Sequence, residues 1–303
     1  MPNRYAVIDL GTNTFHLLVA EQQLDNTFKE LYRKRYFVKL AEEGIEIIGK
    51  ASLQRGLEAL QHFRQVMTEM QVTKVKAIGT AALRTAANGP AFVQKIKEEL
   101  DISIELITGS QEAAYIHQGV AMAVPFEEKN YLLMDIGGGS VEFIIANKDK
   151  VHWAQSFPIG VGVLYKKFHQ HEPILSTEIA ATKAFIAHFL NPLKQALKQY
   201  PAAVLVGASG TFEVLEFLLA KEKVAATYAN VAVTDFYPFY QNILQTTLED
   251  RLRLKEIPDT RADMIIVAVI LIDYTLNLVD IKKIIVSKYA MKEGILADLL
   301  RLA

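Results

Sequence analysis

The sequence contains no cysteine among its 303 residues. This absence excludes disulfide bonds, thiolate nucleophiles and cysteine-ligated metal sites, and it suits a reducing compartment. Long hydrophobic runs are also missing: the longest, residues 264–272, is far too short to span a bilayer. The first residues, MPNRYAVIDLG, show no apolar core of a signal peptide. We therefore expect a cytoplasmic protein that has no membrane partner.

An excess of charge of either sign is lacking as well. The chain carries 33 basic and 34 acidic side chains, so no global field favours nucleic acid, and any site for a polyanion must be local. The length corresponds to about two domains of roughly 150 residues each, and 51% of the residues are hydrophobic. Each half can therefore bury a core of its own.

The first half of the chain reads as three strands followed by alternating helices and strands. β-branched and aromatic runs indicate the strands, and apolar residues three and four apart indicate the helices. The predicted strands are 5–9, 15–20, 31–38, 75–79 and 102–107, and the predicted helices are 52–70, 90–100 and 111–123.

The same order restarts at Tyr131, where YLLMDIGGGSVEFIIA repeats the pattern of YAVIDLGTNTFHLLVA. The second half is predicted to contain strands at 151–157, 203–207 and 283–286, and helices at 177–198, 235–252, 261–278 and 291–300. This internal repeat predicts an α/β protein of two related domains, 1–124 and 125–303, with a ligand cleft between them. The final helix, 290–303, is a candidate to pack back onto the first domain.

Each repeat begins with a strand, an aspartate and a glycine turn. Glycines such as Gly11 and Gly137 let backbone N–H groups approach an anion closely, because no Cβ obstructs it. One such turn is ordinarily a tight hairpin, but a matching pair favours phosphate binding. The candidate phosphate-binding residues of the two turns are Thr12, Asn13, Thr14, Gly137, Gly138, Gly139 and Ser140.

Acidic residues stand beside both turns. Asp9 and Asp135 end their strands, and Glu142 lies just inside the next strand. Carboxylate oxygens are suitable ligands for a hydrated Mg²⁺. We therefore predict a magnesium cofactor held by these three residues.

A third glycine turn, VLVGASGTFEVL, follows the predicted strand 203–207 and starts a helix. Backbone N–H groups at a helix N-terminus bind anions. The predicted phosphate contacts of this turn are Gly207, Ser209, Gly210 and Thr211.

These three turns resemble the actin, sugar-kinase and heat-shock-protein ATPase superfamily, whose two halves are ribonuclease-H-like domains around a phosphate-binding cleft. Six segments, in order, resemble the exopolyphosphatase and guanosine pentaphosphate phosphatase family. They are VIDLGTNTFHLLVAE, AIGTAALRTAANG, ITGSQEAAYIHQGV, LLMDIGGGSVEFIIA, VLVGASGTFEVL and IVSKYAMKEGIL. No histidine is followed by aspartate, as in the metal motif of longer members. The resemblance implies the short, two-domain form.

The resemblance also implies catalytic roles. Glu112 matches the general base that activates water, and Arg84 matches a phosphate-binding arginine, whose guanidinium suits phosphate oxygens. Thr80 can donate a hydroxyl to the substrate. An acidic residue in the first turn of a helix is, by itself, more often only a favourable partner of the helix dipole. The assignment of Glu112 therefore depends on the resemblance.

The implied activity is the Mg²⁺-dependent removal of terminal phosphate from inorganic polyphosphate, and the alternative substrate is guanosine pentaphosphate. Family members often carry arginine where this chain has His16, Ala114 and Lys292. A weaker grip on a long polyanion follows as a hypothesis. Two other classes stay open, a sugar kinase and a phosphate or nucleotide sensor without turnover. The surface that longer members cover also suggests a homodimer.

Overall fold

The computed structural model describes residues 3–23, 27–221 and 224–301. By the contacts within each part, the chain divides into two compact units, Met1–Gly119 with Met291–Ala303, and Val120–Ala290. The predicted boundary at residue 124 falls one residue beyond helix α4 (Gly109–Ala123), whereas the division by contacts falls inside this helix. Helix α13 (Met291–Arg301) belongs to the first unit.

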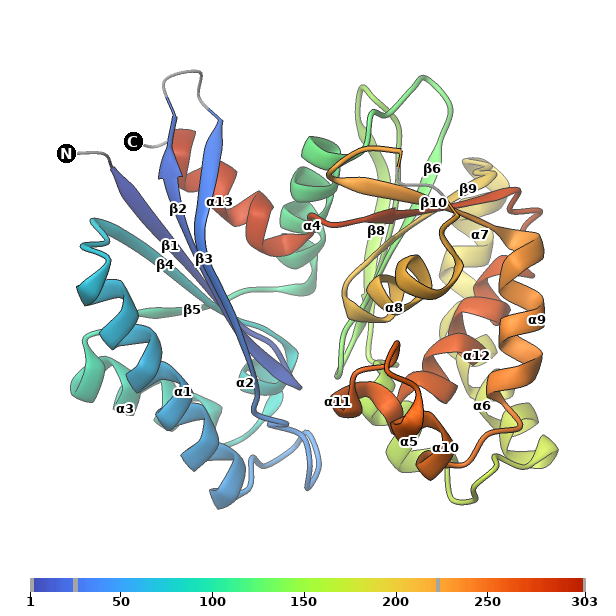
Figure 1. The fold of residues 1–303 in the computed structure, drawn as a ribbon, viewed down its shortest axis with the longest axis horizontal. Helices are drawn as coiled ribbons and strands as arrows, with labels where there is room; N and C mark the ends of the chain where they lie inside the picture. Colours follow the sequence, from blue (N-terminus) through green and yellow to red (C-terminus); the bar gives the residue numbers. More distant parts are fainter. Residues whose placement is uncertain (1–2, 24–26, 222–223, 302–303) are drawn as a thin grey trace. The chain divides into compact units, whose positions relative to one another are not determined.

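The first unit is built on a five-stranded sheet of order β3-β2-β1-β4-β5 (Figure 1). Strand β1 pairs antiparallel with β2 and parallel with β4. The strands are β1 (Arg4–Leu10), β2 (Thr14–Gln22), β3 (Phe28–Phe37), β4 (Lys74–Gly79) and β5 (Ile104–Leu106). The other helices of this unit are α1 (Lys50–Glu69), α2 (Ala81–Thr85) and α3 (Gly89–Leu100).

The two faces of this sheet have different roles. Ile8 and Leu10 of β1 belong to a buried cluster with Phe63 of α1 and Phe92 of α3. Because successive side chains of a strand point to opposite faces, Asp9 lies on the other face. Helix α13 covers that face, where Asp298 accepts a hydrogen bond from Lys76 at 3.0 Å. The hydrophobic face thus anchors the sheet, and the opposite face carries the acidic residue.

The second unit repeats this topology. Its sheet has the order β10-β11-β9-β6-β7-β8, so β8-β7-β6-β9-β11 corresponds to β3-β2-β1-β4-β5, and β10 is an added antiparallel edge strand. The strands are β6 (Tyr131–Ile136), β7 (Val141–Ala146), β8 (Val151–Phe157), β9 (Val204–Ala208), β10 (Tyr228–Ala232) and β11 (Lys283–Ser287). The predicted α/β fold of two ribonuclease-H-like domains is confirmed.

The helices of the second unit are shorter and more numerous than the sequence predicted. They are α5 (Val161–Phe168), α6 (Ser176–Phe189), α7 (Asn191–Gln199), α8 (Gly210–Leu219), α9 (Val233–Ile243), α10 (Leu248–Arg253), α11 (Asp259–Ala262) and α12 (Ile265–Leu276). Helix α12 is buried along nearly its whole length. It is apolar on all sides because it forms the centre of this unit's core.

Three predicted helices are wrong in extent, because each is two helices. Residues 177–198 are interrupted before α7, where Pro192 lacks the N–H that a continuous helix needs. Residues 235–252 are interrupted at Thr247, which caps α10 by accepting a hydrogen bond from the N–H of Asp250. Residues 261–278 divide into α11 and α12. Helices α2 and α5 and strand β10 were not predicted as elements.

Within the described residues, no helix is both long and apolar enough to cross a membrane.

Candidate functional site

The glycine turn of the first unit, residues 11–14, is closed by its own backbone. Gly11 donates its N–H to the carbonyl of Thr14 at 3.0 Å, and a Cβ on Gly11 would lie 3.0 Å from that oxygen. The carbonyl of Thr12 accepts from the N–H of Leu40 at 2.7 Å, and Asn13 accepts from the same segment. Since a trans peptide places its C=O and N–H on opposite sides, the N–H groups that follow these carbonyls point away from that segment. Successive N–H groups that point the same way can form an anion-binding nest, and phosphate binding at this turn stays a prediction.

The turn of the second unit, residues 137–140, has the same design. Gly137 donates to the carbonyl of Ser140 at 3.0 Å, and a Cβ on Gly137 would lie 2.9 Å from that oxygen. The carbonyls of Gly137, Gly138 and Gly139 accept hydrogen bonds of 2.9 to 3.3 Å from the backbone of residues 160–162. The repeat seen in the sequence therefore extends to individual hydrogen bonds.

Gly160, which the sequence analysis did not select, is what lets the backbone of residues 160–162 approach this turn. A Cβ at Gly160 would lie 2.5 Å from the carbonyl carbon and oxygen of Gly138. A left-handed backbone is not the reason for glycine here, since Gly160 has φ −61° and ψ 162°, which any residue can adopt. The available signal was the pair of glycines in PIGVG, directly after a predicted strand.

The acidic residues occupy matching positions in the two sheets. Asp9, 9% exposed, lies opposite His16 on β2. Asp135 lies opposite Glu142 on β7, and buried Glu142 accepts a hydrogen bond from Ser156 Oγ at 2.6 Å. Thr14 Oγ1 is 2.9 Å from His16 Nε2 in the first unit. The position that is acidic in the second repeat is thus a histidine in the first.

The donor set of Asp135 and Glu142 fits a magnesium ion. Two carboxylates directly opposite each other on neighbouring strands repel, and a divalent cation relieves that repulsion. Mg²⁺ is commonly held by one or two carboxylates together with water and substrate phosphate. The described part of the chain contains no group of three or more His, Asp or Glu side chains suited to hold a metal. The predicted magnesium site, with Asp9 as a third ligand, stays a prediction.

The start of helix α4 places Glu112. Thr108 donates its N–H to Gln111 Oε1 at 2.9 Å, and Gln111 donates its own N–H to Thr108 Oγ1 at 3.3 Å. This reciprocal capping box fixes the beginning of the helix. Glu112 follows directly, in the first turn, and is 7% exposed. The base predicted from the family resemblance is therefore a buried carboxylate on a well-capped helix.

Arg84 lies beside Glu112 in the structure. Its Nη1 donates to the carbonyl of Ile107 at 2.5 Å and lies 3.7 Å from Glu112 Oε2. The backbone of Thr80 supports this arrangement, because its carbonyl accepts from the N–H of Arg84 at 3.0 Å and its own N–H donates to Leu10 at 3.3 Å. The end of β1, the start of α2 and the start of α4 are thereby linked in the first unit.

Residues of the third glycine turn have structural contacts of their own within the second unit. The Oγ of Ser209 donates to the carbonyl of Ile136 at 3.0 Å and accepts from its N–H at 3.2 Å, so this hydroxyl joins the ends of β9 and β6. Ser209 has φ 74°, an unfavourable conformation for a serine. A Cβ on Gly207 would lie 2.0 Å from the ring of Phe212. Packing thus accounts for glycine at position 207, and phosphate contact by Gly207, Ser209, Gly210 and Thr211 stays a prediction.

Arg261 is a second residue that the sequence analysis missed. Its guanidinium lies directly on Gly210, where a Cβ would be 1.6 Å from Nη2, and it donates to Glu213 Oε2 at 3.2 Å. The side chain is only 16% exposed. A guanidinium next to the positive end of a helix concentrates positive potential and favours an anion there.

Both sheets contain the same order of five strands, and the first hairpin of each sheet has the same glycine turn, which defines a protein of two ribonuclease-H-like domains. The chain belongs to the Ppx/GppA phosphatase family, whose model matches residues 18–303. This confirms the resemblance drawn from the sequence.

Individual relatives are similar over different lengths. The crystal structure of an exopolyphosphatase from Cytophaga hutchinsonii is 37% identical with a TM-score of 0.94, covering 99% of both chains. A guanosine-5'-triphosphate,3'-diphosphate pyrophosphatase from Vibrio vulnificus is 33% identical over 221 residues, which are 72% of this chain and 44% of that protein. The match thus spans less than half of this curated relative. The Aquifex aeolicus family member, 24% identical with a TM-score of 0.82 over 100% of this chain and 99% of its own, shows the same fold.

Proposed function

We propose that this protein is an exopolyphosphatase, a hydrolase that removes the terminal phosphate of inorganic polyphosphate. The observation that carries the proposal is the buried carboxylate of Glu112 beside the guanidinium of Arg84, within a family of phosphatases. Hydrolysis of a phosphoanhydride requires an oriented water, a proton acceptor and positive charge near the transferred phosphoryl group. The first unit supplies the last two.

In the proposed reaction, Glu112 accepts a proton from the attacking water while the water oxygen bonds to the terminal phosphorus. The bond from that phosphorus to the bridging oxygen breaks, and the shortened chain leaves with this oxygen and its electron pair. Arg84 and Thr80 hold the equatorial oxygens of the phosphoryl group, and the turn N–H groups bind phosphate. A magnesium ion at Asp135 and Glu142, with Asp9 as a further ligand, would neutralise charge on the substrate.

The alternative substrate is guanosine pentaphosphate, from which the same chemistry releases a terminal phosphate. The named activity of the Vibrio vulnificus relative favours it, and that of the Cytophaga hutchinsonii relative favours polyphosphate. A cytoplasmic location and a homodimer remain predictions that accompany this proposal.

The test is the release of orthophosphate from long-chain polyphosphate and from guanosine pentaphosphate, with and without Mg²⁺, at equal phosphate concentration. Glu112→Gln, prepared identically, controls for contaminating phosphatases. Magnesium-dependent release from polyphosphate by the wild type alone supports the proposal. Release from the nucleotide alone would move the assignment to the alternative substrate, and equal release by Glu112→Gln would overturn the catalytic assignment.

A further inference from the structure

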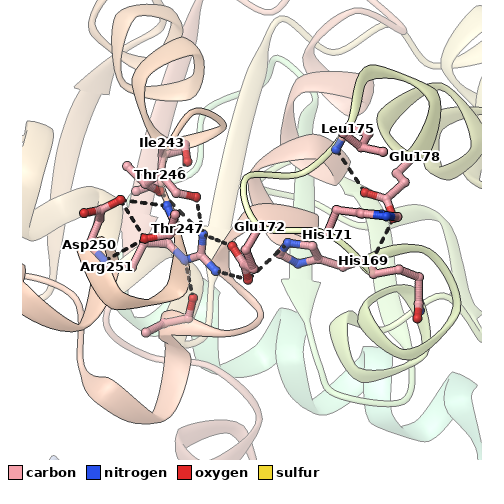
Figure 2. Close-up of polar contacts among 12 residues, drawn as sticks. His169, His171, Glu172, Leu175, Glu178, Ile243, Thr246, Thr247, Asp250 and Arg251 are labelled. Carbon is pink, nitrogen blue, oxygen red and sulfur yellow. Dashed lines mark hydrogen bonds and ion pairs between the residues drawn. The ribbon is translucent and has the colours of Figure 1, made fainter.

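Arg251 of α10 has a guanidinium that is completely buried in the second unit. Its Nε donates to the carbonyl of Ala262 at 2.6 Å, and its Nη1 donates to the carbonyl of Thr246 at 2.8 Å. Nη1 and Nη2 donate to the two carboxylate oxygens of Glu172 at 3.0 and 2.7 Å. Figure 2 shows this guanidinium between Glu172 on one side and Thr246 on the other. One side chain therefore joins three separate segments of the chain.

Glu172 connects this pair to a further buried group. Its Oε1 lies 3.3 Å from Nε2 of His169, whose side chain is 1% exposed (Figure 2). The segment that carries both residues is held by Glu178, which accepts from the N–H of Gln170 at 3.0 Å and from that of Leu175 at 2.9 Å. Glu172 is thus held in place by its own segment. A bidentate pair with such a carboxylate fixes the orientation of the guanidinium as well as its position.

The contact with Ala262 leads to the candidate site. Ala262 directly follows Arg261, whose guanidinium lies on Gly210 at the first residue of α8. Helix α11, which carries both residues, has only four residues and cannot hold its own position by internal hydrogen bonds. The hydrogen bond from Arg251 Nε, together with the burial of Ala262 in the core, holds the backbone from which Arg261 reaches α8.

We propose that Arg251 is a positioning residue for phosphate binding, acting through Arg261. The inference rests on the proposed function, because it assumes that the start of α8 and Arg261 contact substrate phosphate. Glu172 orients the guanidinium of Arg251, Arg251 holds Ala262, and Arg261 is thereby aligned with Gly210. A buried ion pair is weak evidence of stabilisation, since its desolvation offsets much of its attraction. A role in positioning accounts for an arginine here where a hydrophobic side chain would fill the space.

The experiment compares Arg251→Lys and Glu172→Gln with the wild type. Lysine keeps the charge but not the bidentate geometry, and glutamine keeps the shape of Glu172 without its charge. The matched control is Arg253→Lys on the same helix, where Arg253 is 70% exposed and pairs with Glu249. We measure KM and kcat for tripolyphosphate hydrolysis together with the melting temperature.

Positioning predicts that KM rises about tenfold in both variants, the fold-change expected from one lost charge-assisted hydrogen bond. The kcat values are expected to stay within about twofold of the wild type, because Glu112 and Arg84 belong to the other unit. Arg253→Lys is expected to change neither. A lower melting temperature with unchanged KM in both variants would show a merely structural role and overturn the proposal.

A double-mutant cycle with Arg261→Lys gives the decisive readout. If Arg251 acts through Arg261, Arg251→Lys no longer raises KM in the Arg261→Lys background. A full tenfold increase in that background would overturn the proposal. The same cycle is measured as tripolyphosphate affinity by calorimetry in a Glu112→Gln background. A wild type without phosphate release would contradict the proposed function, yet coupling in the calorimetric cycle would still support the positioning role.

Discussion

The two units carry nearly the same glycine turn and very different side chains around it. Gly11 and Gly137 make equivalent hydrogen bonds of 3.0 Å, and in each turn the carbonyls are tied to a following segment. The first unit adds Glu112 and Arg84, whereas the second adds more glycines and Arg261. The repeat therefore duplicates a backbone turn, which we propose binds phosphate, and different side chains surround each copy. We propose that the first unit supplies the proton acceptor and the arginine next to the reacting phosphoryl group, and that the second unit mainly binds the substrate.

The largest effect is expected at Glu112. Glu112→Gln removes the proposed proton acceptor with little change in shape, so kcat is expected to fall by a factor of about 10² to 10⁴. Initial rates of phosphate release from polyphosphate measure this. A kcat within a few-fold of the wild type would remove the main difference between the units.

Substitutions of arginine in the two units are expected to change different kinetic constants. Arg84→Ala is expected to lower kcat by about 10²-fold, because it removes charge next to the reacting phosphoryl group. Arg261→Ala is expected to raise KM about tenfold with kcat nearly unchanged. Steady-state kinetics of the two variants, side by side, provide the measurement. A fall in kcat for Arg261→Ala as large as that for Arg84→Ala would show that both units take part in the chemistry.

Alanine substitutions at one glycine of each unit are expected to weaken tripolyphosphate binding to different extents. A Cβ at Gly160 would lie 2.5 Å from backbone atoms of Gly138, which cannot give way as a side chain can. At Gly11 the nearest atom would be 3.0 Å away. We expect Gly160→Ala to weaken tripolyphosphate binding by about tenfold and Gly11→Ala by less. Calorimetry with a melting curve for each variant checks this, and a stronger effect at Gly11 would contradict it.

The smallest effect concerns pH. Burial lowers the pKa of His117 in the first unit and of His169 in the second, where Glu172 opposes the shift and Arg251 adds to it. The folded protein then binds fewer protons than the unfolded chain below about pH 6.5. The stability that depends on these two neutral histidines is therefore fully present above that pH. It is lost as the pH falls toward their lowered pKa values.

Melting temperatures between pH 5 and pH 7.5 test this expectation. The wild type is expected to melt at lower temperature on the acid side, and His169→Gln to show a shallower dependence. His188→Gln, a change at an exposed histidine of α6, is the control and should leave the slope as it is. An equally steep slope in His169→Gln would mean that this buried histidine does not contribute.

The sequence predicted the parts of the site that are local along the chain. Short sequence patterns were enough to predict both hairpin glycine turns, the strands on either side of them, and the alternation of helices and strands that follows. Glu112 and Arg84 were assigned only through the family resemblance, because one acidic residue at a helix start and one arginine carry no signal of their own. The structure adds what local patterns lacked, namely their separation of 3.7 Å.

The parts that were missed depend on contacts between distant residues. Gly160 is required by Gly138, and Gly210 by Arg261, 51 positions later in the chain. The partner of the Ser209 hydroxyl was missed for the same reason, because Ile136 lies 73 positions away in the chain. The breaks in the predicted helices arose from a proline and a threonine cap inside otherwise helical patterns.

The most direct test of the account is tripolyphosphate binding by the catalytically impaired protein. Calorimetry on Glu112→Gln and on Glu112→Gln with Gly160→Ala separates holding from reacting. The account predicts that Glu112→Gln binds tripolyphosphate with an affinity close to the KM of the wild type, and that the added Gly160→Ala weakens this binding about tenfold. Loss of binding in Glu112→Gln alone, or undiminished binding in the double variant, would contradict the division of roles between the two units.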